Sequence, residues 1–120
     1  MKTSILISLV FLLAFPVISA NAQEKKQDTI RIATSAQCEM CKNRIEKAMA
    51  YEKGVVKSDL DIESKVLTIV YKTAKTDPDR LKKAVTLIGY DADDLIADES
   101  AYSKLPPCCK KPDDPDHTGH

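Results

Sequence analysis

Two cysteines three positions apart, Cys38 and Cys41, lie where the sequence changes from a strand pattern to a helix pattern. Upstream, Thr29–Ala33 alternates polar and apolar residues, the period of a half-buried strand. Downstream, the apolar residues at helical spacing are Cys41, Ile45, Ala48 and Met49. The thiols therefore lie at a helix N-terminus, where orphan N–H groups and the helix dipole favour thiolate over thiol. A soft metal ion or a disulfide fits such a pair.

The rest of the chain continues this alternation of strands and helices. We expect strands at 29–34, 55–61, 66–71 and 93–97, and helices at 41–52 and from Asp77-Pro78 to Gly89. In the second strand, we predict that four side chains lie on the same face: Val56, Ser58, Leu60 and Ile62. Both faces of the third strand are apolar, so its core face stays open. This order predicts an α+β fold, a ferredoxin-like βαββαβ sandwich with two helices on a four-stranded antiparallel sheet.

The N-terminus has the pattern of a secretory signal peptide. Lys2 precedes an apolar run from Ile5 to Ile18, and the small residues Ser19-Ala20-Asn21-Ala22 provide an Ala-x-Ala cleavage site. We predict a signal peptide at residues 1–22, and hence a periplasmic or otherwise extracytoplasmic protein. The run is short for a membrane span, so an uncleaved anchor is the lesser alternative. After cleavage we expect no membrane association.

The net charge and the cysteine spacing reduce the number of functions that fit this chain. The formal net charge of zero gives no reason to expect nucleic acid or anionic lipid as a partner. Four cysteines in an exported chain usually indicate a disulfide framework. Here a Cys38–Cys41 bridge would close a very small loop, and the adjacent pair Cys108-Cys109 would form a strained bond. A structural disulfide role is therefore the weaker interpretation.

Three segments of the chain form a recognisable set: Cys38-Glu39-Met40-Cys41, Gly54-Val55-Val56-Lys57-Ser58 and Leu87-Ile88-Gly89-Tyr90-Asp91. Through these segments, residues 28–97 resemble the heavy-metal-associated domain family of copper chaperones, copper-ATPase modules and a periplasmic mercury-binding protein. The resemblance implies that Cys38 and Cys41 are the metal ligands and that Tyr90 packs beside them. Two features depart from the family pattern: Ser35-Ala36 replaces the usual Gly-Met, and Met40 lies inside the motif, where we expect it to face solvent. Residues 98–120, a connector and a Cys-Cys tail, lie outside the resemblance, and we expect the tail to be disordered unless a metal orders it.

Two thiolates without an obligatory third ligand suit near-linear sulfur coordination. Cu(I) and Hg(II) accept this arrangement, with Cu(I) our first expectation, whereas Zn(II) prefers four ligands. The family resemblance implies an exported metallochaperone, scavenger or transport carrier that passes its ion by ligand exchange. Its partner would be a metal transporter or another Cys-x-x-Cys metal-binding domain. We expect a protein that is not an enzyme and is a monomer without metal.

Three alternatives stay open. Cys108 and Cys109 fold back over the first site and complete a Zn(II) or Cd(II) centre, or bind their own ion with help from His117 and His120, or form a free redox-active tail. The chain could also be an exported thiol-disulfide redox protein, although no Trp precedes the motif and no Pro lies inside it. Finally, it could be an interaction domain with incidental cysteines.

Overall fold

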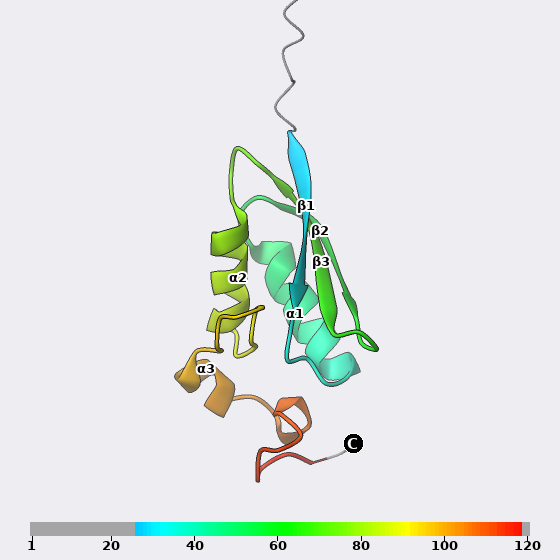
Figure 1. The fold of residues 1–120 in the computed structure, drawn as a ribbon, viewed down its shortest axis with the longest axis vertical. Helices are drawn as coiled ribbons and strands as arrows, with labels where there is room; N and C mark the ends of the chain where they lie inside the picture. Colours follow the sequence, from blue (N-terminus) through cyan, green and yellow to red (C-terminus); the bar gives the residue numbers. More distant parts are fainter. Residues whose placement is uncertain (1–25, 119–120) are drawn as a thin grey trace, which may run out of the picture.

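The computed structural model describes residues 26–118 and contains a three-stranded antiparallel sheet with helices. The elements are β1 (Gln27–Ala33), α1 (Glu39–Tyr51), β2 (Val55–Asp61), β3 (Val66–Lys72), α2 (Pro78–Leu87), α3 (Glu99–Ser103) and a 3₁₀ helix, η1 (Pro107–Cys109) (Figure 1). The strand order is β1-β3-β2. The predicted α+β class is therefore confirmed. The predicted signal peptide lies outside the described residues.

β3 is the central strand, and one of its faces forms the middle of the core. Its inward side chains are Leu67, Ile69 and Tyr71, which are 0%, 0% and 5% exposed. The short turn after β2 makes these two strands a hairpin, with Leu60 opposite Leu67. This arrangement settles which face of β3 is buried, which the sequence left ambiguous.

A register shift near the start of β2 changes the predicted pattern of that strand. Val55 pairs with Tyr71 and Lys57 with Val70, so Val56 is left without a ladder partner. Such a bulge rotates the extra residue away from the alternation of its neighbours. Val56 is consequently 44% exposed, and the prediction that it shares a face with the buried Leu60 is wrong.

Both long helices bury one stripe against this sheet face. α1 buries Cys41, Ile45 and Met49, as the helical spacing predicts. α2 begins as expected, with the Asp77 carboxylate accepting a hydrogen bond from the Arg80 N–H at 2.9 Å. The buried residues of the two helices and the sheet form one cluster. No helix among residues 26–118 is long and apolar enough to cross a membrane.

A fourth strand does not form at 93–97. Instead, two isolated bridges join Thr34 to Ala92 and Ala92 to Leu95. Asp93 has a positive φ of 52°, so the chain turns where a strand would have to extend. Its N–H donates to the Ala33 carbonyl and its carboxylate accepts from the Ala33 N–H, both at 2.8 Å. Asp93 alone thus provides the hydrogen bonds to the Ala33 N–H and C=O groups that a fourth strand would otherwise provide.

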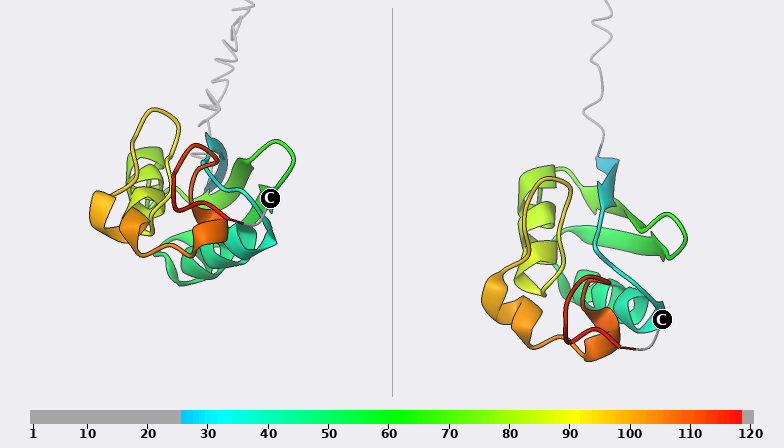
Figure 2. Two further views of the ribbon diagram at one scale, coloured as in Figure 1. Left: turned by 90° about the horizontal axis from the view of Figure 1, so that it is seen from below. Right: turned by 60° about the horizontal axis from the view of Figure 1, so that its bottom comes forward.

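The C-terminal segment also differs from expectation. Residues 98–118, which we expected to hold a connector and a disordered tail, include α3 and η1 and follow a defined path. They run beneath the end of the molecule where β1 ends and α1 begins, and η1 packs against α1 (Figures 1 and 2). Leu105 is 4% exposed and Cys109 1%, so the tail joins the domain core. Burial of apolar side chains supplies the free energy that the composition of the tail did not suggest.

Candidate metal centre

The loop between β1 and α1 positions the two motif cysteines side by side. Cys38 is the N-cap residue of α1, with extended backbone angles (φ −156°, ψ 177°), and Cys41 lies in the first turn. The Cys38 side chain does not cap the helix, so its sulfur remains available to other partners. The two Sγ atoms are 3.6 Å apart and unbridged. The structure therefore brings together the two residues that the sequence singled out.

Hydrogen bonds fix the loop between β1 and α1 around Ser35-Ala36, the residues that replace the Gly-Met of the family pattern. The Thr34 hydroxyl donates to the Lys65 carbonyl at 2.8 Å and accepts from the Ala36 N–H at 3.2 Å. The Ser35 hydroxyl accepts from the Asp91 N–H at 2.9 Å. Ala36 itself is only 2% exposed and belongs to the core. The loop is thus anchored on both sides without the family's methionine.

The Cys41 thiol is buried, yet its surroundings favour ionisation. Burial alone would raise its pKa, because the interior solvates a thiolate poorly. Hydrogen bonding from the Gln37 backbone and from the side chains of Cys109 and Tyr90 acts in the opposite direction. Together with the Cys38 backbone these groups outweigh burial, so the pKa of Cys41 is lowered from its ordinary value. The thiolate, the form that binds metal, is therefore more accessible at Cys41 than in an ordinary cysteine.

Tyr90 reaches this site from the turn after α2. Gly89 makes the turn with a φ of +101°, and a Cβ atom at this position would lie 3.0 Å from the Ala101 carbonyl oxygen. The Tyr90 hydroxyl is fully buried and has no oxygen or nitrogen hydrogen-bond partner. Burial and the neighbouring thiols of Cys109 and Cys41 raise the pKa of this phenol, so it stays protonated. Tyr90 therefore presents an O–H group to two sulfur atoms.

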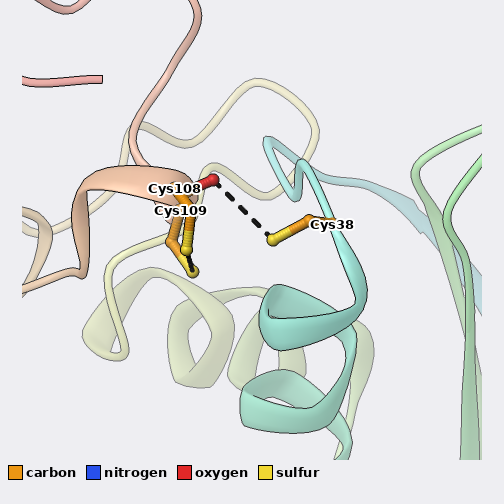
Figure 3. Close-up of side chains that lie close together, drawn as sticks. All are labelled: Cys38, Cys108 and Cys109. Carbon is orange, nitrogen blue, oxygen red and sulfur yellow. Dashed lines mark hydrogen bonds between the residues drawn. The ribbon is translucent and has the colours of Figure 1, made fainter. Parts of the chain in front are cut away.

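The tail brings a second pair of thiols to the same place. Cys38, Cys108 and Cys109 have their Sγ atoms within 4.8 Å of one another, and Figure 3 shows both η1 cysteines beside the start of α1. The Cys38 thiol also donates to the Cys108 carbonyl at 3.7 Å, the contact drawn as a dashed line. Cys108 Sγ lies 3.5 Å from Met40 Sδ and 4.0 Å from Cys109 Sγ. Three thiols therefore lie together, with Cys41 Sγ beside Cys38 and Met40 Sδ beside Cys108.

The two tail thiols differ in exposure and acidity. Cys109 is 1% exposed, and burial followed by the nearby Cys41 thiol raises its pKa well above the ordinary range. Cys108 is partly exposed at the rim, next to Met40, which is 47% exposed. Met40 thus faces solvent, as expected, and also contacts the tail, which the sequence did not suggest.

A small polar cluster fastens the tail to the domain. The Tyr102 hydroxyl donates to the Asp114 carboxylate at 2.7 Å and accepts from the Lys111 N–H at 3.0 Å. The Lys111 ammonium forms a 2.7 Å ion pair with Asp91, in the loop after Tyr90. We call Tyr102, Asp114, Lys111 and Asp91 the tail clamp. No sequence motif identifies the clamp, although an aromatic residue in an otherwise polar connector is a weak indication of docking.

Of the two tail histidines, only His117 lies among the described residues, and it is not part of the sulfur cluster. His117 Nδ1 lies 2.7 Å from the Lys110 carbonyl oxygen. His120 lies outside the described residues. Within residues 26–118 the donor set at this point is therefore sulfur, which selects soft ions over Mg²⁺ or Ca²⁺.

Comparison with known proteins agrees with this geometry. Residues 35–91 match the family model of the heavy-metal-associated domain. Just under half of the chain is thus similar to a heavy-metal-associated domain. The resemblance seen in the sequence is confirmed, and the tail cysteines lie outside the matched residues.

Individual proteins are similar to the same part of the chain. A copper-exporting P-type ATPase of Staphylococcus saprophyticus is 34% identical over 70 residues, which make up 57% of this chain but only 9% of the ATPase. Oxidized MerP from Ralstonia metallidurans CH34 is similar in structure, with a TM-score of 0.53 and 26% identity over 56% of this chain and 94% of MerP. The CopZ metallochaperone has a TM-score of 0.52 over 54% of this chain and 98% of its own. At 24% identity, the CopZ similarity shows the fold alone.

Proposed function

We propose that this protein is an exported carrier of a soft metal ion, which it holds between the thiolates of Cys38 and Cys41. The observation that carries the proposal is the pair of unbridged Sγ atoms 3.6 Å apart at the start of α1. Thiolate ligands favour soft ions. Burial opposes the ionisation of Cys41, but its pKa is nevertheless lowered, which makes the metal-binding thiolate easier to form. The role is carriage rather than catalysis.

The unequal exposure of the two ligands suggests how the ion is passed on. Cys41 is inaccessible to solvent, whereas Cys38 is partly exposed on the loop. A thiolate of a partner reaches the ion from the Cys38 side, forms a three-coordinate intermediate and displaces Cys38 before Cys41. The partner that fits this chemistry is a metal transporter or another Cys-x-x-Cys domain, in keeping with the similarity to part of a copper-exporting ATPase.

Cu(I) is the ion that we propose first, with Hg(II) second. Both accept two thiolates, and similarity to a copper-exporting ATPase and to MerP favours this pair of metals. Residues 1–22 would export the chain to the periplasm or another extracytoplasmic space, where we propose that it acts as a monomer.

The test is an anaerobic competition titration of the reduced protein with Cu(I), Hg(II) and Zn(II). We expect one tightly bound Cu(I) or Hg(II) per chain, and weaker Zn(II). Cys38→Ser combined with Cys41→Ser should abolish tight Cu(I) binding. Tight Cu(I) binding that survives this double substitution would place the ion elsewhere and refute the proposal.

A thiol-disulfide redox function is the second candidate, favoured by the lowered pKa of Cys41, a property of reactive cysteines. Against it, no Trp precedes the Cys38–Cys41 motif and no Pro lies inside it. An insulin-reduction assay separates the two functions, because a metal carrier should give no rate above that of free thiols.

A further inference from the structure

The cysteines of η1 are not explained by the heavy-metal-associated domain. They lie outside the matched residues 35–91, yet they stand beside Cys38, whose side chain points toward them (Figure 3). A tail that merely trails the domain would have no reason to bury Cys109 to 1% exposure beside the metal loop. The convergence of Cys38, Cys108 and Cys109 therefore calls for a chemical role.

We propose that Cys108 and Cys109 close the site, so that Cys38, Cys108 and Cys109, with Cys41 as the fourth ligand, hold one thiophilic ion in three- or four-sulfur coordination. The inference rests on the proposed function, because it takes the same motif cysteines as half of the ligand set. It adds a closed state in which the ion is retained rather than offered to a partner.

The sulfur separations fit several ligands around one ion. With a metal–sulfur bond of about 2.3 Å, the edge of a tetrahedron is about 3.8 Å, and a linear pair of sulfurs is about 4.6 Å apart. The separation is 3.6 Å for Cys38–Cys41 and 4.0 Å for Cys108–Cys109. Both within-pair distances are closer to the tetrahedral edge than to the linear separation. Across the pairs, Cys38 Sγ lies within 4.8 Å of both tail sulfurs, so one ion can contact these three thiols after modest side-chain movements, and Cys41 Sγ is next to Cys38.

The tail clamp prepares this closed state before any ion arrives. The Tyr102–Asp114 hydrogen bond and the Lys111–Asp91 ion pair, both 2.7 Å, hold the segments on either side of η1. Ligands that are already in place lose less conformational freedom on binding, which raises affinity. Each thiol that becomes a ligand releases one proton to solvent, so no oxidant or reductant is required.

The closed state also changes transfer. In the metal-free structure the Cys108 carbonyl oxygen already lies 3.7 Å from Cys38 Sγ, so the tail lies over the accessible motif ligand. A partner thiolate must then displace the tail or enter beside Cys108 and Met40, the exposed rim of the cluster. The tail thus makes this protein a tighter store for its ion than an open two-thiolate carrier.

The test uses Cd(II) as the probe, with the reduced full chain under anaerobic conditions. X-ray absorption gives the number of sulfur ligands, and competition with a chelator gives the affinity. We expect three or four sulfurs for the unmodified protein and two for Cys108→Ser with Cys109→Ser. That variant should bind Cd(II) more weakly by at least about a hundredfold, because even outer-shell partners of a metal contribute about 10–100-fold. Lys104→Ser, an exposed change in the same segment, should leave both values unaltered.

Two outcomes would overturn the inference. Equal affinity and two sulfurs in both proteins would show that the tail takes no part, and the proposed function would stand if Cu(I) binding still required Cys38 and Cys41. Full Cd(II) affinity in Cys38→Ser with Cys41→Ser would show that the tail pair binds its own ion. Alkylation with mass spectrometry is an independent check that needs no variant: one equivalent of Cd(II) should protect Cys108 and Cys109 in the unmodified chain, and continued labelling of both would contradict the closed site.

Discussion

At the scale of single residues, the contact of Tyr90 with two thiols distinguishes this site from a simple cysteine pair. Its hydroxyl is buried without an oxygen or nitrogen partner, and such a group costs about 1–3 kcal/mol. The hydroxyl also helps to lower the pKa of Cys41 against the opposing effect of burial. The Tyr90 hydroxyl therefore helps Cys41 to ionise but does not stabilise the folded protein.

The change Tyr90→Phe separates these two effects. We expect the free energy of unfolding to stay the same or rise by up to about 1 kcal/mol, because an unsatisfied buried group is removed. The pKa of Cys41 should rise, because a hydrogen-bond donor to its thiolate is lost. Urea unfolding and the pH dependence of ultraviolet thiolate absorbance measure the two quantities. Tyr51→Phe is the matched control, since Tyr51 is 84% exposed and should change neither. An unchanged Cys41 titration in the Tyr90→Phe variant would contradict this role.

At the scale of elements, residues 26–118 follow the sequence patterns closely where local chemistry is strong. β2 has the predicted bounds, Val55–Asp61, and Asp77 caps α2 through Arg80 as expected. The expected fourth strand is absent because Asp93 turns the chain and bonds β1 itself. Alternation alone cannot reveal a turn that is stabilised by a distant partner.

The docked tail depends on the clamp, which Tyr102→Phe should weaken. The substitution removes the hydroxyl that donates to Asp114 and accepts from the Lys111 N–H. We expect the undocked tail to become several-fold more populated in the metal-free protein. Faster alkylation of Cys108 and Cys109 at neutral pH would show this. If both thiols react at the unmodified rate, the hydroxyl does not hold the tail.

The clamp should also respond to acid. The hydrogen bond from the Tyr102 hydroxyl lowers the pKa of Asp114 from its ordinary value. A carboxyl group with a lowered folded-state pKa stabilises docking above its ordinary pKa, and this contribution disappears as the pH falls through the lowered value. We expect the NMR signal of the Lys111 N–H, which donates to Tyr102, to move as the metal-free protein is acidified through that range. In Asp114→Asn the movement should be missing; a full transition in that variant would assign it to another group.

At the scale of the whole molecule, the domain and the tail form one core around a group of sulfurs. The cysteine pair and its place at a strand-to-helix junction could be read from the sequence, because both depend on local spacing. The position of the tail could not, because Leu105 and Cys109 are buried by residues more than one element away. Their side chains turn a polar segment into part of the fold.

The central claim is that this molecule holds a soft ion through sulfur alone, with Cys38 and Cys41 as indispensable ligands. The most direct measurement is X-ray absorption at the copper edge of the reduced protein loaded with one equivalent of Cu(I), beside the Cys38→Ser/Cys41→Ser variant. We predict a first shell that contains only sulfur in the unmodified protein, and no retained copper in the variant after passage over a chelator. A first shell of nitrogen or oxygen, or a folded, reduced protein that retains no Cu(I), would contradict the account.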